Sequence, residues 1–161
     1  MDHSQHMQHS EHSQHSPYAA QKAGAIKALT DAEVASYKKG EGMGLAKAAE
    51  LNSYPGPMHV LELADQLSLS ADQKATVQES MHKVKAEAAR LGETIVENEA
   101  ELDKMFRESS IDPEQLRTKT EQIAKLQGEL RNAHLQAHIE MKKLLTPEQV
   151  ENYDRLRGYK K

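Results

Sequence analysis

Five histidines recur at every third position near the start of the chain: His3, His6, His9, His12 and His15. The imidazole ring binds copper, nickel and zinc, and the thioether of Met7, which lies among them, suits Cu(I). Ser, Gln and Glu fill most of the remaining positions, so residues 1–16 have nothing with which to build a core. We therefore predict a tail that is disordered without a ligand and binds metal; the alternative is a solvated polar tail.

A second group of metal-ligand side chains lies far from the tail. His134, His138 and Met141 are four and three residues apart, which places them on one stripe of a helix. The helix pairing argued below puts His82 opposite this stripe, and His59 is a further candidate. We predict a second, more rigid metal site here. The alternative is that these histidines are ordinary helix residues.

The groups that catalysis needs are missing from these patterns. His134 and His138 have the spacing of a zinc-peptidase helix, but Leu135 stands where that chemistry needs a glutamate base. The glycines at 40, 42 and 44 follow no strand and precede no Lys-Ser or Lys-Thr pair, so they form no phosphate-binding loop. The chain has no cysteine, which excludes thiolate metal sites and thiol nucleophiles. We predict that the protein is not an enzyme.

The composition favours helices. Of 161 residues, 37% are hydrophobic and only 4% are aromatic, which is poor material for a β-sandwich or a doubly wound α/β domain. Ala, Glu, Gln, Lys and Leu dominate, and they are good helix formers. The net charge of -4 gives no general attraction for nucleic acid, and no apolar run is long enough for membrane insertion. These features predict an all-α protein.

Residues 17–56 are expected to form a lead-in of short helices. Thr30 and Glu33 make a capping box for a first helix, and the glycines within 40–44 end it. A second short helix is expected at about 45–51, before a turn over 54–57. Pro57 then begins an amphipathic helix that we extend to Leu67.

Two long helices follow, one over residues 71–107 and one that begins after Asp112 at Pro113. Because the break between them is short, they must fold back antiparallel. In that arrangement apolar residues pair so that their numbers add to 218: Leu102–Leu116, Ile95–Ile123, Ala88–Leu130, Met81–Ala137 and Val77–Met141. We predict a hairpin domain over 57–161, with its remaining apolar surface covered by short helices, a second copy of the chain, or both.

Two short motifs give the chain a family resemblance. Residues 69–73 (LSADQ) and 145–149 (LTPEQ) look like two copies of an LTxxQ motif, and they open the first and last helices of the hairpin unit. This arrangement resembles the Spy/CpxP family of periplasmic stress proteins, which includes zinc-resistance-associated proteins and CnrX-type nickel–cobalt sensors. The resemblance covers roughly residues 57–157. It implies a hairpin-based fold, a cradle-shaped dimer, periplasmic location and no enzymatic activity.

Members of this family differ in function, so the resemblance leaves alternatives. The CnrX-like branch suggests His59 and His82 as counterparts of ligands on the first two helices. Met141 sits in a place comparable to the family's methionine, but Ala137 stands four residues before it and His138 lies close by instead. We predict a periplasmic homodimer that binds copper, or else zinc, nickel or cobalt, and serves metal tolerance. The alternatives are a chaperone for unfolded client proteins and a sensor subunit with a signalling partner.

Overall fold

The computed structural model describes residues 14–161. Five of the predicted tail ligands therefore lie outside the described residues: His3, His6, Met7, His9 and His12. Between residues 14 and 161 the chain is helical and contains no strand, which confirms the all-α prediction.

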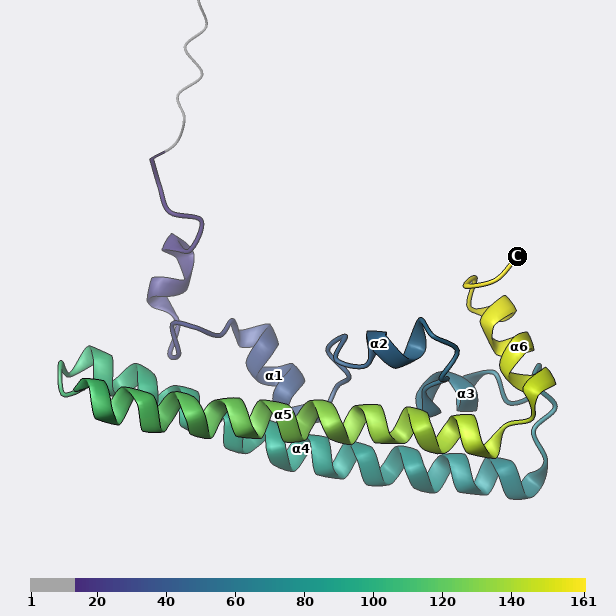
Figure 1. Ribbon diagram of the computed structural model, residues 1–161. Coiled ribbons are helices and arrows are strands. Elements are labelled where there is room, and N and C mark those ends of the chain that lie inside the picture. The colour runs from purple at the N-terminus through teal and green to yellow at the C-terminus, as the bar shows by residue number, and fades with distance from the viewer. Residues whose placement is uncertain (1–13) are drawn as a thin grey trace, which may run out of the picture.

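One 3-10 helix and six α-helices make up this part of the chain: η1 (Ala19–Ala23), α1 (Asp31–Lys39), α2 (Lys47–Glu50), α3 (Pro57–Glu62), α4 (Ala71–Arg107), α5 (Pro113–Leu144) and α6 (Pro147–Leu156). The long helices α4 and α5 form a hairpin, and α1, α2 and α3 lie along it in chain order (Figure 1). At the end opposite the hairpin turn, α3 and α6 lie close to the ends of the two long helices.

Polar side chains begin the helices where the sequence predicts them. Ser70 Oγ accepts a hydrogen bond from the Gln73 backbone N–H at 3.1 Å, and Gln73 Oε1 accepts one from the Ser70 N–H at 3.0 Å. The same reciprocal pattern begins α1, α5 and α6, whose N-cap residues are Thr30, Asp112 and Thr146. Each pair satisfies N–H groups that the start of a helix leaves without partners.

The two long helices pack against each other in the predicted register. Val77 and Met141 belong to one buried cluster, and Ala88 and Leu130 belong to another. Each of these pairs satisfies the constant sum of 218. The packing confirms that the hairpin is antiparallel and that its apolar seams face each other.

One polar residue interrupts the seam and finds partners there. Asn98 Oδ1 accepts a hydrogen bond from Lys119 Nζ at 3.2 Å, across the hairpin. Its amide nitrogen donates to the Thr94 carbonyl oxygen at 2.8 Å on its own helix. Because both ends of the amide are bonded, this polar side chain is accommodated between the helices.

The open end of the hairpin is closed by α3, α6 and the two glutamine motifs. A buried cluster joins these elements: Val60, Leu67, Val77, Met141, Leu145, Val150 and Tyr153. Beside it the side-chain amides of Gln73 and Gln149 bond to each other, with nitrogen-to-oxygen distances of 2.8 and 3.0 Å. The two copies of the motif therefore contact each other directly.

Two glycines let α1 lie directly on α4. A Cβ added to Gly92 would stand 2.0 Å from the Tyr37 carbonyl oxygen, so the last turn of α1 rests on the glycine itself. Gly40 ends α1 in the left-handed conformation, with φ of 68°, and a Cβ there would stand 2.5 Å from the Lys85 carbonyl oxygen. Tyr37 then packs against the cluster formed by Ala88 and its neighbours.

Two of the predicted short helices are longer in the prediction than in the structure. The helix expected at about 45–51 spans only Lys47–Glu50, and the helix expected to reach Leu67 ends at Glu62. At Leu63 the backbone leaves the helical range, and the Ala64 N–H bonds three residues back to the Leu61 carbonyl. The turns over 63–68 still bury Ala64 and Leu67, so the apolar pattern identified buried positions correctly but not the helix end.

The hairpin turn is the less covered end of the molecule. Phe106 and Leu116 near the turn are 55% and 36% exposed, and Leu102 is half-buried. A groove of about 460 Å³ lies beside Leu102 and Phe106, and Lys27 and Arg107 are among the residues that line it. None of the helices within residues 14–161 is both long and apolar enough to cross a membrane.

Candidate functional site

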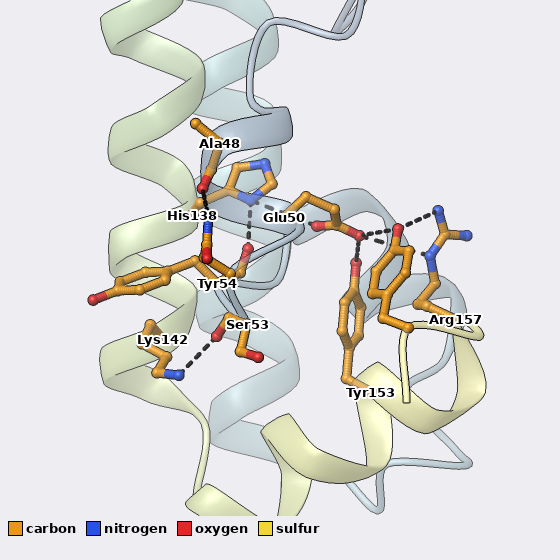
Figure 2. Close-up of polar contacts among 10 residues, drawn as sticks. Ala48, Glu50, Ser53, Tyr54, His138, Lys142, Tyr153 and Arg157 are labelled. Atoms are coloured by element: carbon orange, nitrogen blue, oxygen red, sulfur yellow. Dashed lines mark hydrogen bonds and ion pairs between the residues drawn. The ribbon is translucent and has the colours of Figure 1, made fainter. Parts of the chain in front are cut away.

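Residues 45–56, called the strap below, comprise α2 and the loops on either side of it. The strap lies against α5, and its C-terminal end leads into α3. Side chains from α5 and α6 converge on it (Figure 2). These contacts bring together residues that are about 80 to 110 positions apart in the sequence.

His138 of α5 is bonded to the strap backbone. Its Nδ1 lies 2.6 Å from the Tyr54 carbonyl oxygen. A carbonyl oxygen can only accept, so Nδ1 carries the proton and donates it. A Cβ on Gly56 would stand 2.9 Å from His138 Cε1 and 3.0 Å from Nε2. The imidazole therefore packs directly on the glycine backbone, and its side chain is only 12% exposed.

Glu50 of the strap links this histidine to α6. Its Oε1 accepts hydrogen bonds from Tyr153 Oη at 2.6 Å and Tyr159 Oη at 2.9 Å, and Arg157 Nε lies 3.7 Å away. Its Oε2 lies 3.6 Å from His138 Nδ1 and is buried without a hydrogen-bond partner. Burial, and then the bond to Glu50, raise the pKa of Tyr153, so its hydroxyl keeps the proton it donates.

A second set of bonds holds the strap beside this network. Lys142 Nζ donates to the Ser53 carbonyl oxygen at 2.7 Å and lies 5.0 Å from the centre of the Tyr54 ring. Ser53 Oγ donates to Asp154 Oδ2 at 2.5 Å. Figure 2 shows Lys142 and Ser53 on the far side of Tyr54 from Glu50. The strap is therefore fixed to α5 and α6 at several points, and His138 is one of them.

His134 lies one turn before His138 on α5. Its ring is partly buried, and Nε2 is buried without a hydrogen-bond partner. Burial, and to a lesser extent the neighbouring His138, lower the pKa of His134. The ring is therefore uncharged at neutral pH, which is the form that binds a metal ion.

The lowered pKa of His134 predicts a loss of stability in mild acid. Below about pH 6.5 the unfolded chain binds a proton at this residue while the folded chain does not, so the free energy of unfolding falls as the pH falls. One proton contributes at most about 1.4 kcal/mol per pH unit. In chelator, the free energy of unfolding of the wild type should fall relative to that of His134→Gln between pH 7.5 and 5.5, as measured by urea denaturation. A constant difference over this range would contradict the assignment.

The other predicted ligands have different surroundings. Met141 is 1% exposed and belongs to the buried cluster at the open end. His59 Nδ1 lies 2.9 Å from Glu62 Oε2 on its own helix, and His82 is exposed on α4. His15 is the one tail histidine within the described residues, where it is exposed.

In the part of the chain that the structure describes, no three or more His, Asp or Glu side chains are grouped so that they could hold a metal ion. What the structure does bring together is a smaller set, with His138 and Glu50 adjacent and His134 one turn away. Sequence reasoning missed Glu50 and the Tyr54 carbonyl. The one signal nearby was the Tyr54-Pro55-Gly56-Pro57 turn, in which a Cβ on Gly56 would crowd the His138 ring.

The fold defines a class of protein: an all-helical hairpin whose open end is closed where the two glutamine motifs bond to each other. The sequence profile of a family described as heavy-metal resistance matches residues 34–152, and the chain belongs to that family. The family is Spy/CpxP-like, so the resemblance predicted from the two motifs is confirmed. Searches among curated proteins and among solved structures found no significant match.

Proposed function

We propose that this protein protects the cell against heavy metal by binding the ion in the periplasm, and that copper is the main ion. The observation that carries the proposal is the heavy-metal resistance family match over residues 34–152. This family is non-catalytic, and its members are typically secreted or periplasmic. The histidine repeat that begins at His3 and ends at His15 precedes the matched region and supplies ligands of the right chemistry.

Metal is cargo in this proposal, and the ligands fall into two groups. The tail offers five imidazoles and the Met7 thioether on a polar segment that can wrap around an ion. The hairpin offers His138 and His134. The Nε2 atom of His134 is buried without a hydrogen-bond partner. Met141, His59 and His82 are secondary candidates, and Met141 would have to leave the buried cluster to bind an ion.

Replacing the five tail histidines with glutamine should remove most copper binding. The expected result is fewer copper ions per chain than in the wild type, measured by mass spectrometry of the native protein. Because imidazole must lose its proton to bind, the wild type should also lose affinity steeply below about pH 6. If the variant binds as many copper ions as tightly as the wild type, the tail is not the capture site.

A chaperone role is the second candidate, and the exposed apolar residues at the hairpin turn favour it. Phe106 is 55% exposed beside the groove at Leu102, which offers a surface for unfolded clients or for a second copy of the chain. A protein that suppresses aggregation of a denatured client in the presence of chelator acts as a chaperone without metal. If suppression of aggregation requires copper, or if the protein does not suppress aggregation under either condition, metal binding is favoured as the primary function.

A further inference from the structure

We propose that Glu50, His138 and the Tyr54 carbonyl form a divalent-ion site that fastens the strap to α5 when metal binds. The proposal rests on the metal-binding function above and adds a ligand from outside the hairpin. It assigns the strap a role: it is the element that closes over the ion. The site joins two side chains and a backbone oxygen, with His134 as a third side chain one turn away.

The distances suit two ligands of one ion. His138 Nδ1 and Glu50 Oε2 are 3.6 Å apart. Two ligand atoms bound to one tetrahedral zinc ion at about 2.1 Å each stand about 3.4 Å apart. The Tyr54 carbonyl oxygen is 2.6 Å from the same Nδ1, so it would have to move away by about 0.8 Å to become a third ligand of that ion. The two side chains are therefore already near the separation of two ligands, and metal binding requires the strap backbone at Tyr54 to shift.

In the metal-free arrangement a proton takes the place of the ion. Nδ1 carries that proton because it donates to the Tyr54 carbonyl. When the ion binds Nδ1, the proton on this nitrogen moves to Nε2 by way of solvent, and the ring stays neutral. The bond between Nδ1–H and the carbonyl is replaced by bonds from the ion to both atoms.

One buried atom beside His138, Glu50 Oε2, lacks a partner that an ion would supply, and a second unpartnered atom lies one turn away on His134. Glu50 Oε2 and His134 Nε2 are both buried without a hydrogen bond. Buried polar atoms are normally paired, so such atoms call for an explanation. The hydroxyls of Tyr153 and Tyr159 both bond to Glu50 Oε1, which orients the carboxylate and leaves Oε2 directed to the His138 side. This is how outer residues commonly orient a metal ligand.

The donor set distinguishes this site from the tail. One imidazole nitrogen and two oxygens suit Zn²⁺, Ni²⁺, Co²⁺ or Cu²⁺ rather than Cu(I), which prefers sulfur ligands such as Met7. The strap site is therefore expected to bind divalent zinc and to ignore Cu(I).

The test uses the full chain with its five tail histidines replaced by glutamine, so that the tail contributes no imidazole. Zinc is added at about one hundred times its dissociation constant, and amide hydrogen exchange is followed over residues 45–56. If bound zinc must leave before the strap opens, exchange there should slow by up to about one hundredfold. Glu50→Gln keeps Oε1 as an acceptor for both tyrosines but weakens the ligand, so it should abolish most of the slowing. Glu97→Gln, an exposed change on α4, is the matched control and should leave the slowing intact.

A second variant guards against a fold defect in the first. His138→Gln leaves Glu50 and its tyrosines in place and should also abolish the slowing, while far-ultraviolet circular dichroism confirms that both variants keep the helical content. The proposal would be overturned if zinc slowed exchange equally with and without the Glu50→Gln change. It would also be overturned if zinc sped up exchange over residues 45–56 or left it unchanged. Suppose that the chain without tail histidines binds no zinc while the wild type still binds copper. That result would overturn the strap site but would leave the proposed metal-binding function supported. If neither binds any ion, both fall.

Discussion

Replacing Gln149 with alanine should lower the free energy of unfolding by about 2–3 kcal/mol, because it removes several partly buried hydrogen bonds at once. Gln149 Nε2 donates to the Leu67 carbonyl at 3.2 Å and to Gln73 Oε1 at 3.0 Å. Its Oε1 accepts from Gln73 Nε2 at 2.8 Å and from the Thr146 N–H at 2.9 Å. The substitution therefore leaves the Leu67 carbonyl and part of the Gln73 amide without partners, next to a buried cluster.

Gln115→Ala is the matched control for this prediction. Gln115 holds the same third position in a capping box, where its Oε1 accepts from the Asp112 N–H at 3.1 Å, and it is exposed. Its loss should cost about 1 kcal/mol, the typical value for a cap. Urea denaturation of both variants compares them. Equal losses would mean that the contact between the two motifs adds nothing beyond capping.

A double-mutant cycle isolates the contact itself. Gln73→Ala removes the other half of the amide pair, so the double variant should be less destabilised than the sum of the two single variants. The expected interaction free energy is about 1–2 kcal/mol, within the range for residues in direct contact. Additive losses would show that each glutamine acts only within its own helix start.

The starts of the helices and the hairpin register were predictable because local chemistry determines them. Ser70, Asp112 and Thr146 cap helices through atoms three residues away, which sequence alone places correctly. The apolar seam predicted the partners of Val77 and Ala88, since a short connection leaves only one way for two long helices to fold back. The bond between Gln73 and Gln149 was not predictable in this way, because it depends on how α6 is placed at the open end.

The candidate site was predicted only in part, and the reason is the strap. His134 and His138 share a stripe by helical spacing, which any helix gives. Glu50 meets His138 because residues 45–56 take an irregular path over α5, and α2 within them is only four residues long. No periodicity specifies such a path. The sum of 218 also placed His82 opposite residue 136, but register fixes neighbouring positions rather than side-chain directions, and His82 is exposed on α4.

Replacing Gly92 with alanine should weaken or release the contact between α1 and α4. The added Cβ would stand 2.0 Å from the Tyr37 carbonyl oxygen, and that atom belongs to backbone rather than to a flexible side chain. Forcing extra atoms into a close contact costs about 1–3 kcal/mol. The helix also gains up to about 1 kcal/mol when alanine replaces glycine in its interior, so the net loss is smaller than the clash alone.

Gly128→Ala separates these two effects, because Gly128 lies within α5 and a Cβ there would meet nothing within 4 Å. It gains the same helix propensity without a clash and should raise the free energy of unfolding by about 0.5–1 kcal/mol. The difference between the two variants in urea denaturation therefore measures the clash at Gly92. Hydrogen exchange locates it: amides of residues 31–44 should exchange faster in Gly92→Ala, while those of the open end stay unchanged. If Gly92→Ala is as stable as Gly128→Ala and α1 keeps its protection, then α1 does not depend on this close approach, and the α1–α4 contact must be able to widen without loss.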